Sequence, residues 1–355
     1  MTSNNLDDKC ITLLTNALSN NKTLSTLSLG SNRSVTIAGW QHFVRWLQTS
    51  NASVEKIDLG NNRLSDELVG ALANNTKLQA LGIKDLLLYP PRQRTPTSFS
   101  RLVTPTGWQN FFVRLQNSGS VLEELNLYCD KIDDSVVPAM VDALASISTL
   151  TELDLSNQSI SAQGWCTFFS LLPNSSLRSL SLSENHFTDA PVRAFANALV
   201  RNSTLETIDL AFNGITKSGW EALANVLCDK SSISHLFSSN HALQEVKVSS
   251  RTARQSRSFR TFNNAGLTDD LLASLQLNTN SNKFEVARQK ILQHWFTNGN
   301  ANIEGFADME WKVMPRTIAW AGRDDTGLSL LFRIILSMPS LLDVADKREP
   351  SGVRR

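Results

Sequence analysis

A nine-residue pattern, Leu-x-x-Leu-x-Leu-x-x-Asn, recurs along most of the 355-residue chain and limits its fold more than any other feature. From Leu127 onward the third apolar position returns at Leu155, Leu182 and Leu210, in steps of 28, 27 and 28 residues. Apolar side chains at alternate positions of an extended segment lie on one face. Each copy therefore predicts a short strand with one buried side. The third apolar positions of the seven copies are Leu29, Leu59, Ile83, Leu127, Leu155, Leu182 and Leu210.

Two kinds of segment alternate between the predicted strands, and both predict helices. In one kind a Gly-Trp pair opens an apolar run at helical spacing, as in Gly39-Trp40 followed by Phe43. In the other an apolar residue is followed by Ser, Thr or Asp, which can cap a helix, as in Leu64-Ser65-Asp66. Each unit is thus expected to be a strand, a turn and a helix. Further copies begin at Gly107, Gly164 and Gly219 for the first kind, and at Leu6, Ile132, Phe187 and Leu267 for the second.

This alternation of two helix types, at a unit length near 28 residues, resembles the ribonuclease-inhibitor class of leucine-rich repeats over about residues 5–275. The resemblance implies an α/β solenoid, or horseshoe, with parallel strands on the concave face and helices on the convex face. One unit cannot bury its apolar side alone, so stacked units are expected to share a continuous core. We expect the recurring tryptophans to pack helix against helix in that core.

Two places depart from the repeat spacing. The step from Ile83 to Leu127 is 44 residues, and the prolines within 89–96 predict an exposed loop there. After Leu210 the next strand could lie at 233–238 or at 243–248. From about residue 281 an apolar pattern of helical spacing replaces the repeat. We therefore expect a repeat domain over 1–280 with insertions near 84–105 and 239–264, a helical C-terminal cap over 281–342, and a disordered tail over 343–355.

Charge, cysteine use and hydropathy narrow the partners and the compartment. The formal net charge is +1 and the pI is about 7.7, so nucleic acid is not an expected partner. The four cysteines stand far apart, which favours reduced thiols over a disulfide framework or a zinc site. The first residues lack the features of a signal peptide, and no apolar run is long enough to span a membrane. We expect a soluble cytoplasmic protein without a membrane partner, with the nucleus as an alternative location.

The chain shows no sequence motif of enzyme chemistry. Its five histidines form no His-Glu-x-x-His pair, and neither a Gly-x-Ser-x-Gly elbow nor a dinucleotide fingerprint occurs. We therefore predict no catalytic residue, no metal site, no cofactor and no small-molecule substrate, and we do not expect an enzyme.

Function is expected on the concave face, where the residues that alternate with the buried apolar positions point. These residues are rich in carboxylates, so we predict that a basic protein surface docks there, with Tyr128 as an aromatic anchor. The alternative is that they are only the polar residues that any exposed strand face needs. The candidate residues are Lys56, Asp58, Lys84, Glu124, Asn126, Tyr128, Glu152, Asp154 and Asp209.

A second candidate contact is the segment 247–260, which holds five basic residues and no acidic residue. Serines interleave with the basic residues, which predicts a flexible loop. The loop is either a solvated insertion without a partner, or a contact for an acidic protein or a localisation signal. Its basic residues are Lys247, Arg251, Arg254, Arg257 and Arg260.

The sequence thus predicts a non-enzymatic interaction module or scaffold that binds another protein through its concave face. An alternative comes from a second resemblance, because this type of repeat is similar to that of the GTPase-activating protein for the small GTPase Ran. That resemblance implies a regulator that acts on the active site of a partner GTPase. Acceleration of GTP hydrolysis by a Ran-type GTPase would distinguish the two functions.

Overall fold

The computed structural model describes residues 4–49, 53–83, 103–128, 132–248 and 267–295, which divide into two compact units. Unit 1 contains the described residues up to Gly219 together with 245–248, and unit 2 contains 220–244 and 267–295. Four predicted segments lie outside the described residues: 84–102 and 249–264 of the insertions, 296–342 of the cap, and the tail 343–355.

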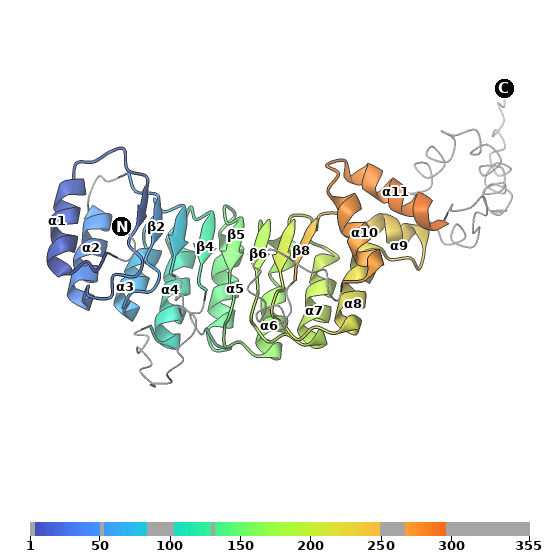
Figure 1. The fold of residues 1–355 in the computed structure, drawn as a ribbon, viewed down its shortest axis with the longest axis horizontal. Helices are drawn as coiled ribbons and strands as arrows, with labels where there is room; N and C mark the ends of the chain where they lie inside the picture. Colours follow the sequence, from blue (N-terminus) through green and yellow to red (C-terminus); the bar gives the residue numbers. More distant parts are fainter. Residues whose placement is uncertain (1–3, 50–52, 84–102, 129–131, 249–266, 296–355) are drawn as a thin grey trace, which may run out of the picture. The chain divides into compact units, whose positions relative to one another are not determined.

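Within the described residues, unit 1 contains eight parallel three-residue strands whose order in the sheet is their order in the chain (Figure 1). The middle residue of each strand is buried, as for Leu27, Leu125 and Ile208. This confirms the predicted alternation of buried apolar positions. The strands are β1 (Thr26–Ser28), β2 (Lys56–Asp58), β3 (Ala80–Gly82), β4 (Glu124–Asn126), β5 (Glu152–Asp154), β6 (Ser179–Ser181), β7 (Thr207–Asp209) and β8 (Glu245–Lys247).

The position of the eighth strand settles the ambiguity that the sequence left after Leu210. The structure places β8 within the second of the two predicted ranges, and the first range forms helix α9 (Ile233–Ser238). Ser232 caps this helix by accepting a hydrogen bond from the backbone N–H of His235. An apolar run of this length is compatible with either structure, and the cap decides for the helix.

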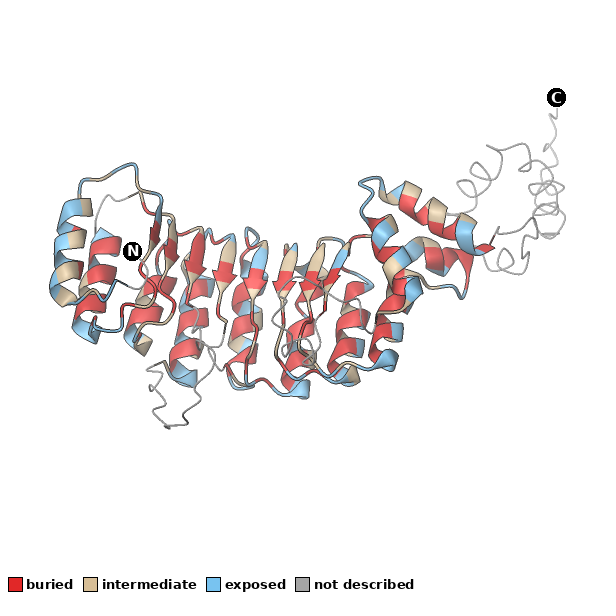
Figure 2. Ribbon diagram, in the orientation of Figure 1, coloured by how far each residue is buried: buried red, intermediate tan, exposed pale blue. Residues whose placement is uncertain are grey.

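Helices cover one face of the unit 1 sheet and bury its apolar side chains against their inner sides (Figures 1 and 2). Trp108 is 2% exposed, and its ring meets that of Phe111 edge-to-face at 5.5 Å. The predicted burial of the repeated tryptophans is confirmed. The helices are α1 (Asp8–Leu18), α2 (Ile37–Thr49), α3 (Asp66–Ala73), α4 (Pro105–Asn117), α5 (Val137–Ser146), α6 (Ala162–Phe169), the 3₁₀ turn η1 (Leu172–Asn174), α7 (Asp189–Leu199) and α8 (Lys217–Leu227), which continues into unit 2.

The asparagine of the repeat pattern links each repeat to the next from inside the turns. The side chain of Asn62 donates to the carbonyls of Leu29 and Leu59, each at 2.9 Å, and its Oδ1 accepts the backbone N–H of Asn32 at 2.8 Å. One amide thus satisfies backbone groups of two consecutive repeats, and these groups would otherwise be buried without partners. The same role falls to Asn32, Gln158, Asn185 and Asn213.

A second repeated link joins each acidic-type helix to the Gly-Trp helix that follows it. Both carboxylate oxygens of Asp134 in the turn before α5 accept from Ser161, from its N–H at 2.7 Å and its hydroxyl at 2.5 Å. The carboxylate lies so close to α6 that a Cβ at Gly164 would overlap it. This explains the glycine of the Gly-Trp pair. We call the four residues in this position the connector aspartates: Asp8, Asp66, Asp134 and Asp189.

Unit 2 contains α9, α10 (Asp269–Asn278) and α11 (Lys283–Trp295) together with the remainder of α8. Lys290 of α11 is 2% exposed, and its ammonium group donates to the carbonyl of Leu227 at 2.6 Å. The same group lies 3.4 Å from the carbonyl of Asn240 and 3.2 Å from Nδ1 of His241. Burial lowers the pKa of Lys290 to about 7 and that of His241 to about 4. A buried amine therefore joins the end of α8 to the segment after α9.

Candidate functional site on the strand face

The strand face consists of the first and third residues of each strand of unit 1, whose side chains point away from the helices. The parallel register aligns these residues into two rows across the sheet. The first row is Thr26, Lys56, Ala80, Glu124, Glu152, Ser179, Thr207 and Glu245. The second row is Ser28, Asp58, Gly82, Asn126, Asp154, Ser181, Asp209 and Lys247.

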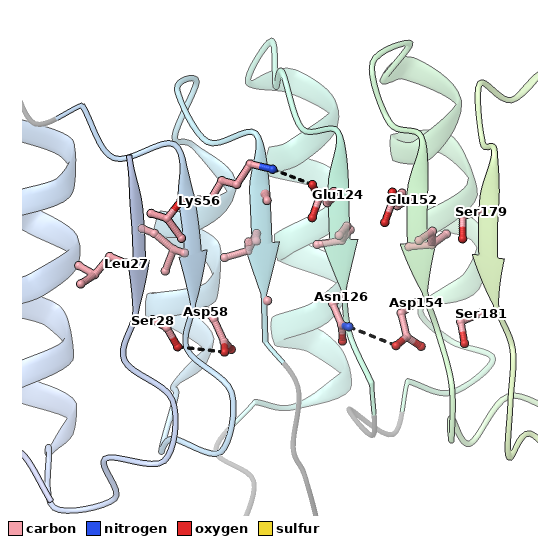
Figure 3. Close-up of a pocket in the computed structure, with 17 residues that line it drawn as sticks. Leu27, Ser28, Lys56, Asp58, Glu124, Asn126, Glu152, Asp154, Ser179 and Ser181 are labelled. Carbon is pink, nitrogen blue, oxygen red and sulfur yellow. Dashed lines mark hydrogen bonds and ion pairs between the residues drawn. The ribbon is translucent and has the colours of Figure 1, made fainter. Parts of the chain in front are cut away.

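A groove of about 440 Å³ lies on this face over strands β1 to β6 (Figure 3). Its smallest side chains are those of β3, Ala80 and Gly82, so the groove has a gap in both rows at this strand. Charged and polar side chains line it from both rows, together with the apolar middle residues of the strands, such as Ile57 and Leu125. The groove spans six strands, and this extent suits a protein surface better than a small ligand.

Carboxylates gather in the first row on β4 and β5. Glu124 and Glu152 are directly paired in the parallel register, so two like charges stand on neighbouring strands. Glu124 is held by Lys56 of β2, whose ammonium lies 2.8 Å from its Oε1. In the described part of the chain, the carboxylate of Glu152 has no hydrogen bond or ion pair.

The carboxylates of the second row have a structural task that those of the first row lack. Oδ1 of Asp154 accepts the backbone N–H of Ser156 at 2.9 Å, and Asp58 does the same for Gly60 at 3.0 Å. In each case the side chain satisfies the backbone just after its own strand, as in an Asx turn. Asn126 and Asp209 repeat this arrangement. One oxygen of each second-row carboxylate is therefore committed to the fold.

Asp209 is the most buried carboxylate of the second row. Burial raises its pKa, while the backbone N–H of Ala211 and the charge of Lys247 oppose the increase. Lys247 is paired with it in the register of β7 and β8. The end of the strand face at β8 thus carries a cation beside a carboxylate.

The structure brings most of the predicted residues together on the strand face. Both rows contain the predicted Lys56, Asp58, Glu124, Asn126, Glu152, Asp154 and Asp209. Tyr128 follows β4, is half-buried, and its hydroxyl donates to Glu184 at 3.4 Å. Lys84 lies outside the described residues.

The basic segment requires one correction of placement. We predicted Lys247 as part of a flexible loop, but it forms the last residue of β8 and belongs to the second row. The register after Leu210 was open in the sequence, so its strand position could not be assigned. The other basic residues of the segment, Arg251, Arg254, Arg257 and Arg260, lie outside the described residues.

The sequence analysis did not place Ala80, Gly82 and Glu245 on the strand face, and it did not include the small polar residues of that face, Thr26, Ser28, Ser179, Ser181 and Thr207, among its candidates. Ala80 and Gly82 belong to the weakest copy of the repeat, and small side chains give no sign of a binding role. The repeat register could have placed Ala80 and Gly82 on this face, because Leu81 is the middle position of that copy and they flank it.

Two further properties concern only the described residues. They contain no cluster of three or more His, Cys, Asp or Glu side chains arranged to hold a metal ion. None of their helices combines the length and apolar character needed to cross a bilayer.

Comparison with known proteins supports the assignment of the fold. A family model described as Leucine Rich repeat matches residues 174–196 and 201–224, the segments that contain β6 with α7 and β7 with α8. No curated protein matches the chain at a significant level. The solved structure of Leiomodin-1 Actin-Binding Site 2 is 16% identical, covers 53% of this chain and 92% of its own, and has a TM-score of 0.32. Similarity at this level does not bear on a partner. The chain contains leucine-rich repeats, and its fold is a leucine-rich-repeat solenoid.

Proposed function

We propose that the strand face binds a partner protein through a basic surface. Leucine-rich-repeat solenoids typically act as protein-interaction modules that use an extended surface. The observation that carries the proposal is the pairing of Glu124 with Glu152 on adjacent strands. Like charges placed opposite each other on neighbouring strands repel, and of the two carboxylates Lys56 pairs only with Glu124. A cationic side chain of a partner, placed between the two carboxylates, would relieve the repulsion.

The proposed surface includes the second row and its surroundings. Oδ2 of Asp209 has no hydrogen bond within the described residues, whereas Oδ2 of Asp58 and Oδ2 of Asp154 each accept a side-chain hydrogen bond, from Ser28 and Asn126. Tyr128 is proposed as an aromatic contact beside β4, since the hydrogen bond to Glu184 holds its ring in place. Lys84 and the basic residues of 247–260 stay proposed contacts. In this proposal the repeats are of the ribonuclease-inhibitor type, the chain is not an enzyme, and it acts in the cytoplasm or the nucleus.

Regulation of a Ran-type GTPase stays an alternative prediction. No observation within the described residues favours it over a binding module. Addition of substoichiometric amounts of the chain to a GTP-loaded Ran-type GTPase tests it directly, since an activator would accelerate hydrolysis.

The proposed function is tested by removing the first-row carboxylates, which accept no hydrogen bond from the backbone. The variant is Glu124→Gln with Glu152→Gln, and the control is Glu67→Gln with Asp142→Asn, which removes two charges from exposed positions on α3 and α5. Each protein is used for affinity capture from a cell extract, with mass spectrometry of the bound proteins. We expect proteins with basic surfaces to be lost from the strand-face variant and retained by the control. Identical sets of bound proteins would contradict the proposal.

A further inference from the structure

The side chain of Lys56 follows an unusual path across the strand face. It begins on β2, passes over β3 and reaches Glu124 on β4, where Nζ and Oε1 are 2.8 Å apart (Figure 3). Lys56, Ala80 and Glu124 occupy the same row, so the side chain crosses the position of Ala80. A larger residue at that position would stand in its way. The small side chain of β3 therefore makes the contact possible.

The contact places one cation among several carboxylates. The pKa of Lys56 is raised, first by its hydrogen bond to Glu124 and by the charge of Glu124, and further by the charges of Glu123 and Glu152. Glu123 and Glu152 are exposed, and neither carboxylate has a hydrogen bond or ion pair within the described residues. The single ammonium group of Lys56 thus lies near three carboxylates, and only one of them, that of Glu124, is paired with it.

The ion pair is open to solvent on both sides. The side chain of Lys56 is 42% exposed and that of Glu124 is 45% exposed. Exposed pairs of this kind contribute little to stability, because water and salt screen them and because both long side chains lose freedom. Lys56 can therefore leave Glu124 at low cost when another cation approaches.

We infer that Lys56 competes with the partner for Glu124. Its ammonium group pairs with Glu124 in the free protein and is displaced when a lysine- or arginine-rich segment of the partner binds. The inference rests on the proposed function, because it assumes that the strand face receives a basic partner. It adds that the site is already shaped for an ammonium group, since the chain holds one of its own there. Lys56 then sets specificity by reducing the affinity for weakly basic partners.

The direction in which Lys56→Gln changes the affinity for a cationic peptide tests this inference. If Lys56 competes, Lys56→Gln frees Glu124 and raises the affinity for a cationic peptide. If Lys56 instead contacts the partner, the same change lowers the affinity. Lys77→Gln is the matched control, because Lys77 is an exposed lysine three residues before β3 that loses the same charge. Lys56→Arg keeps the cation and is expected to bind like the unaltered protein.

The measurement is fluorescence anisotropy of a labelled lysine-rich peptide, with a glutamate-rich peptide of equal length as the negative probe. We expect Lys56→Gln to bind the lysine-rich peptide about two- to fivefold more tightly than the unaltered chain, and Lys77→Gln to change affinity less than about twofold. Equal effects of Lys56→Gln and Lys77→Gln, or weaker binding by Lys56→Gln, would overturn the inference.

A further variant separates this inference from the proposed function. Glu124→Gln with Glu152→Gln is expected to weaken binding of the lysine-rich peptide. If it does so while Lys56→Gln fails to strengthen binding, the competitor role is wrong and the proposed site stands. If neither variant changes binding, or no protein binds the peptide, both the proposed site and the competitor role are wrong.

Discussion

At the scale of single residues, the carboxylates of the strand face fall into two groups with different tasks. Glu124 and Glu152 in the first row carry charge without supporting the backbone. Asp154 in the second row accepts the N–H of Ser156 and a side-chain N–H of Asn126. Removing charge from the first row therefore tests binding, whereas removing it from the second row also tests the fold.

This difference predicts unequal effects on stability. Asp154→Ala removes both hydrogen bonds of that carboxylate and is expected to lower the free energy of unfolding by about 1–2 kcal/mol. Glu152→Ala removes only a charge that faces Glu124 and is expected to leave stability unchanged or slightly higher. Urea denaturation of the two variants measures the difference. Equal losses would show that the rows do not differ in structural role.

Sequence reasoning reached many residues of the site but not their contacts. The two-residue alternation of a strand placed Glu124 and Asp154 on the same face, because it depends only on the repeat pattern. The contact of Lys56 with Glu124 could not be predicted in that way. It skips a strand, and it depends on Ala80 being small in the copy of the repeat with the weakest pattern.

At the scale of secondary-structure elements, the connector aspartates explain why a glycine stands before each repeated tryptophan. The carboxylate of Asp134 fills the space where a Cβ at Gly164 would lie, while also accepting the N–H and hydroxyl of Ser161. The helix N-terminus is a favourable place for a carboxylate, because its free N–H groups carry partial positive charge. Two consecutive helices are joined by this one side chain.

A substitution in α6 tests this explanation. Gly164→Ala is expected to destabilise unit 1 by about 1–3 kcal/mol, because the new methyl group overlaps Asp134 and lies 2.7 Å from Cγ2 of Ile160. Gly70→Ala in α3 is the control, since its Cβ would meet only the flexible side chain of Arg114 at 3.4 Å. This control should be neutral or slightly stabilising, because alanine favours a helix interior. A neutral Gly164→Ala would refute the explanation.

The buried lysine that joins the helices of unit 2 predicts a dependence of stability on pH. The pKa of Lys290 in the folded chain is about 7, below the ordinary value of 10.5. Between these values the unfolded chain binds more protons, so the contribution of Lys290 to stability rises with pH and its cost is fully present below about pH 7. His241 has a pKa of about 4 and stays neutral throughout that range.

Lys290→Met should remove this contribution. We expect the free energy of unfolding of the chain that keeps Lys290 to increase relative to the variant as the pH rises from about 7 to about 9. Both proteins carry Cys228→Ser, because burial raises the pKa of the Cys228 thiol and this thiol and Lys290 shift each other's pKa. Urea denaturation at several pH values measures the difference. A difference that does not change with pH would show that the ammonium group is not penalised by burial.

The helices and strands were largely predictable from the sequence, whereas the hydrogen bonds that connect one helix to the next were not. Strands follow from the apolar positions of each copy, and helix starts follow from local caps such as Ser65 and Thr104. The sequence left open whether Ser65 or Asp66 caps the helix; Ser65 does so, and Asp66 accepts hydrogen bonds from Thr104 of the next Gly-Trp helix. That partner is distant in the sequence, so local reasoning could not find it.

At the scale of the whole molecule, positive and negative charges nearly cancel, but they are unevenly distributed over the surface. The chain has a formal net charge of only +1, yet the two rows of the strand face hold six carboxylates against two ammonium groups among the described residues. A near-neutral molecule exerts little attraction at long range, so a basic partner would respond to this face only when close. Attraction of this kind acts over about a Debye length, which is about 10 Å at 0.1 M salt and about 3 Å at 1 M.

Salt should therefore weaken the binding of a cationic peptide in a way that depends on the first row. We expect the affinity of the lysine-rich peptide to fall steadily as sodium chloride is raised, because the ions screen carboxylates that stand at the surface. The fall should be less steep for Glu124→Gln with Glu152→Gln, since two of the charges that attract the peptide are absent. Anisotropy titrations of both proteins over the same salt series measure the two slopes. Parallel slopes would place the attraction elsewhere on the chain, and an affinity independent of salt would indicate apolar contacts such as the ring of Tyr128.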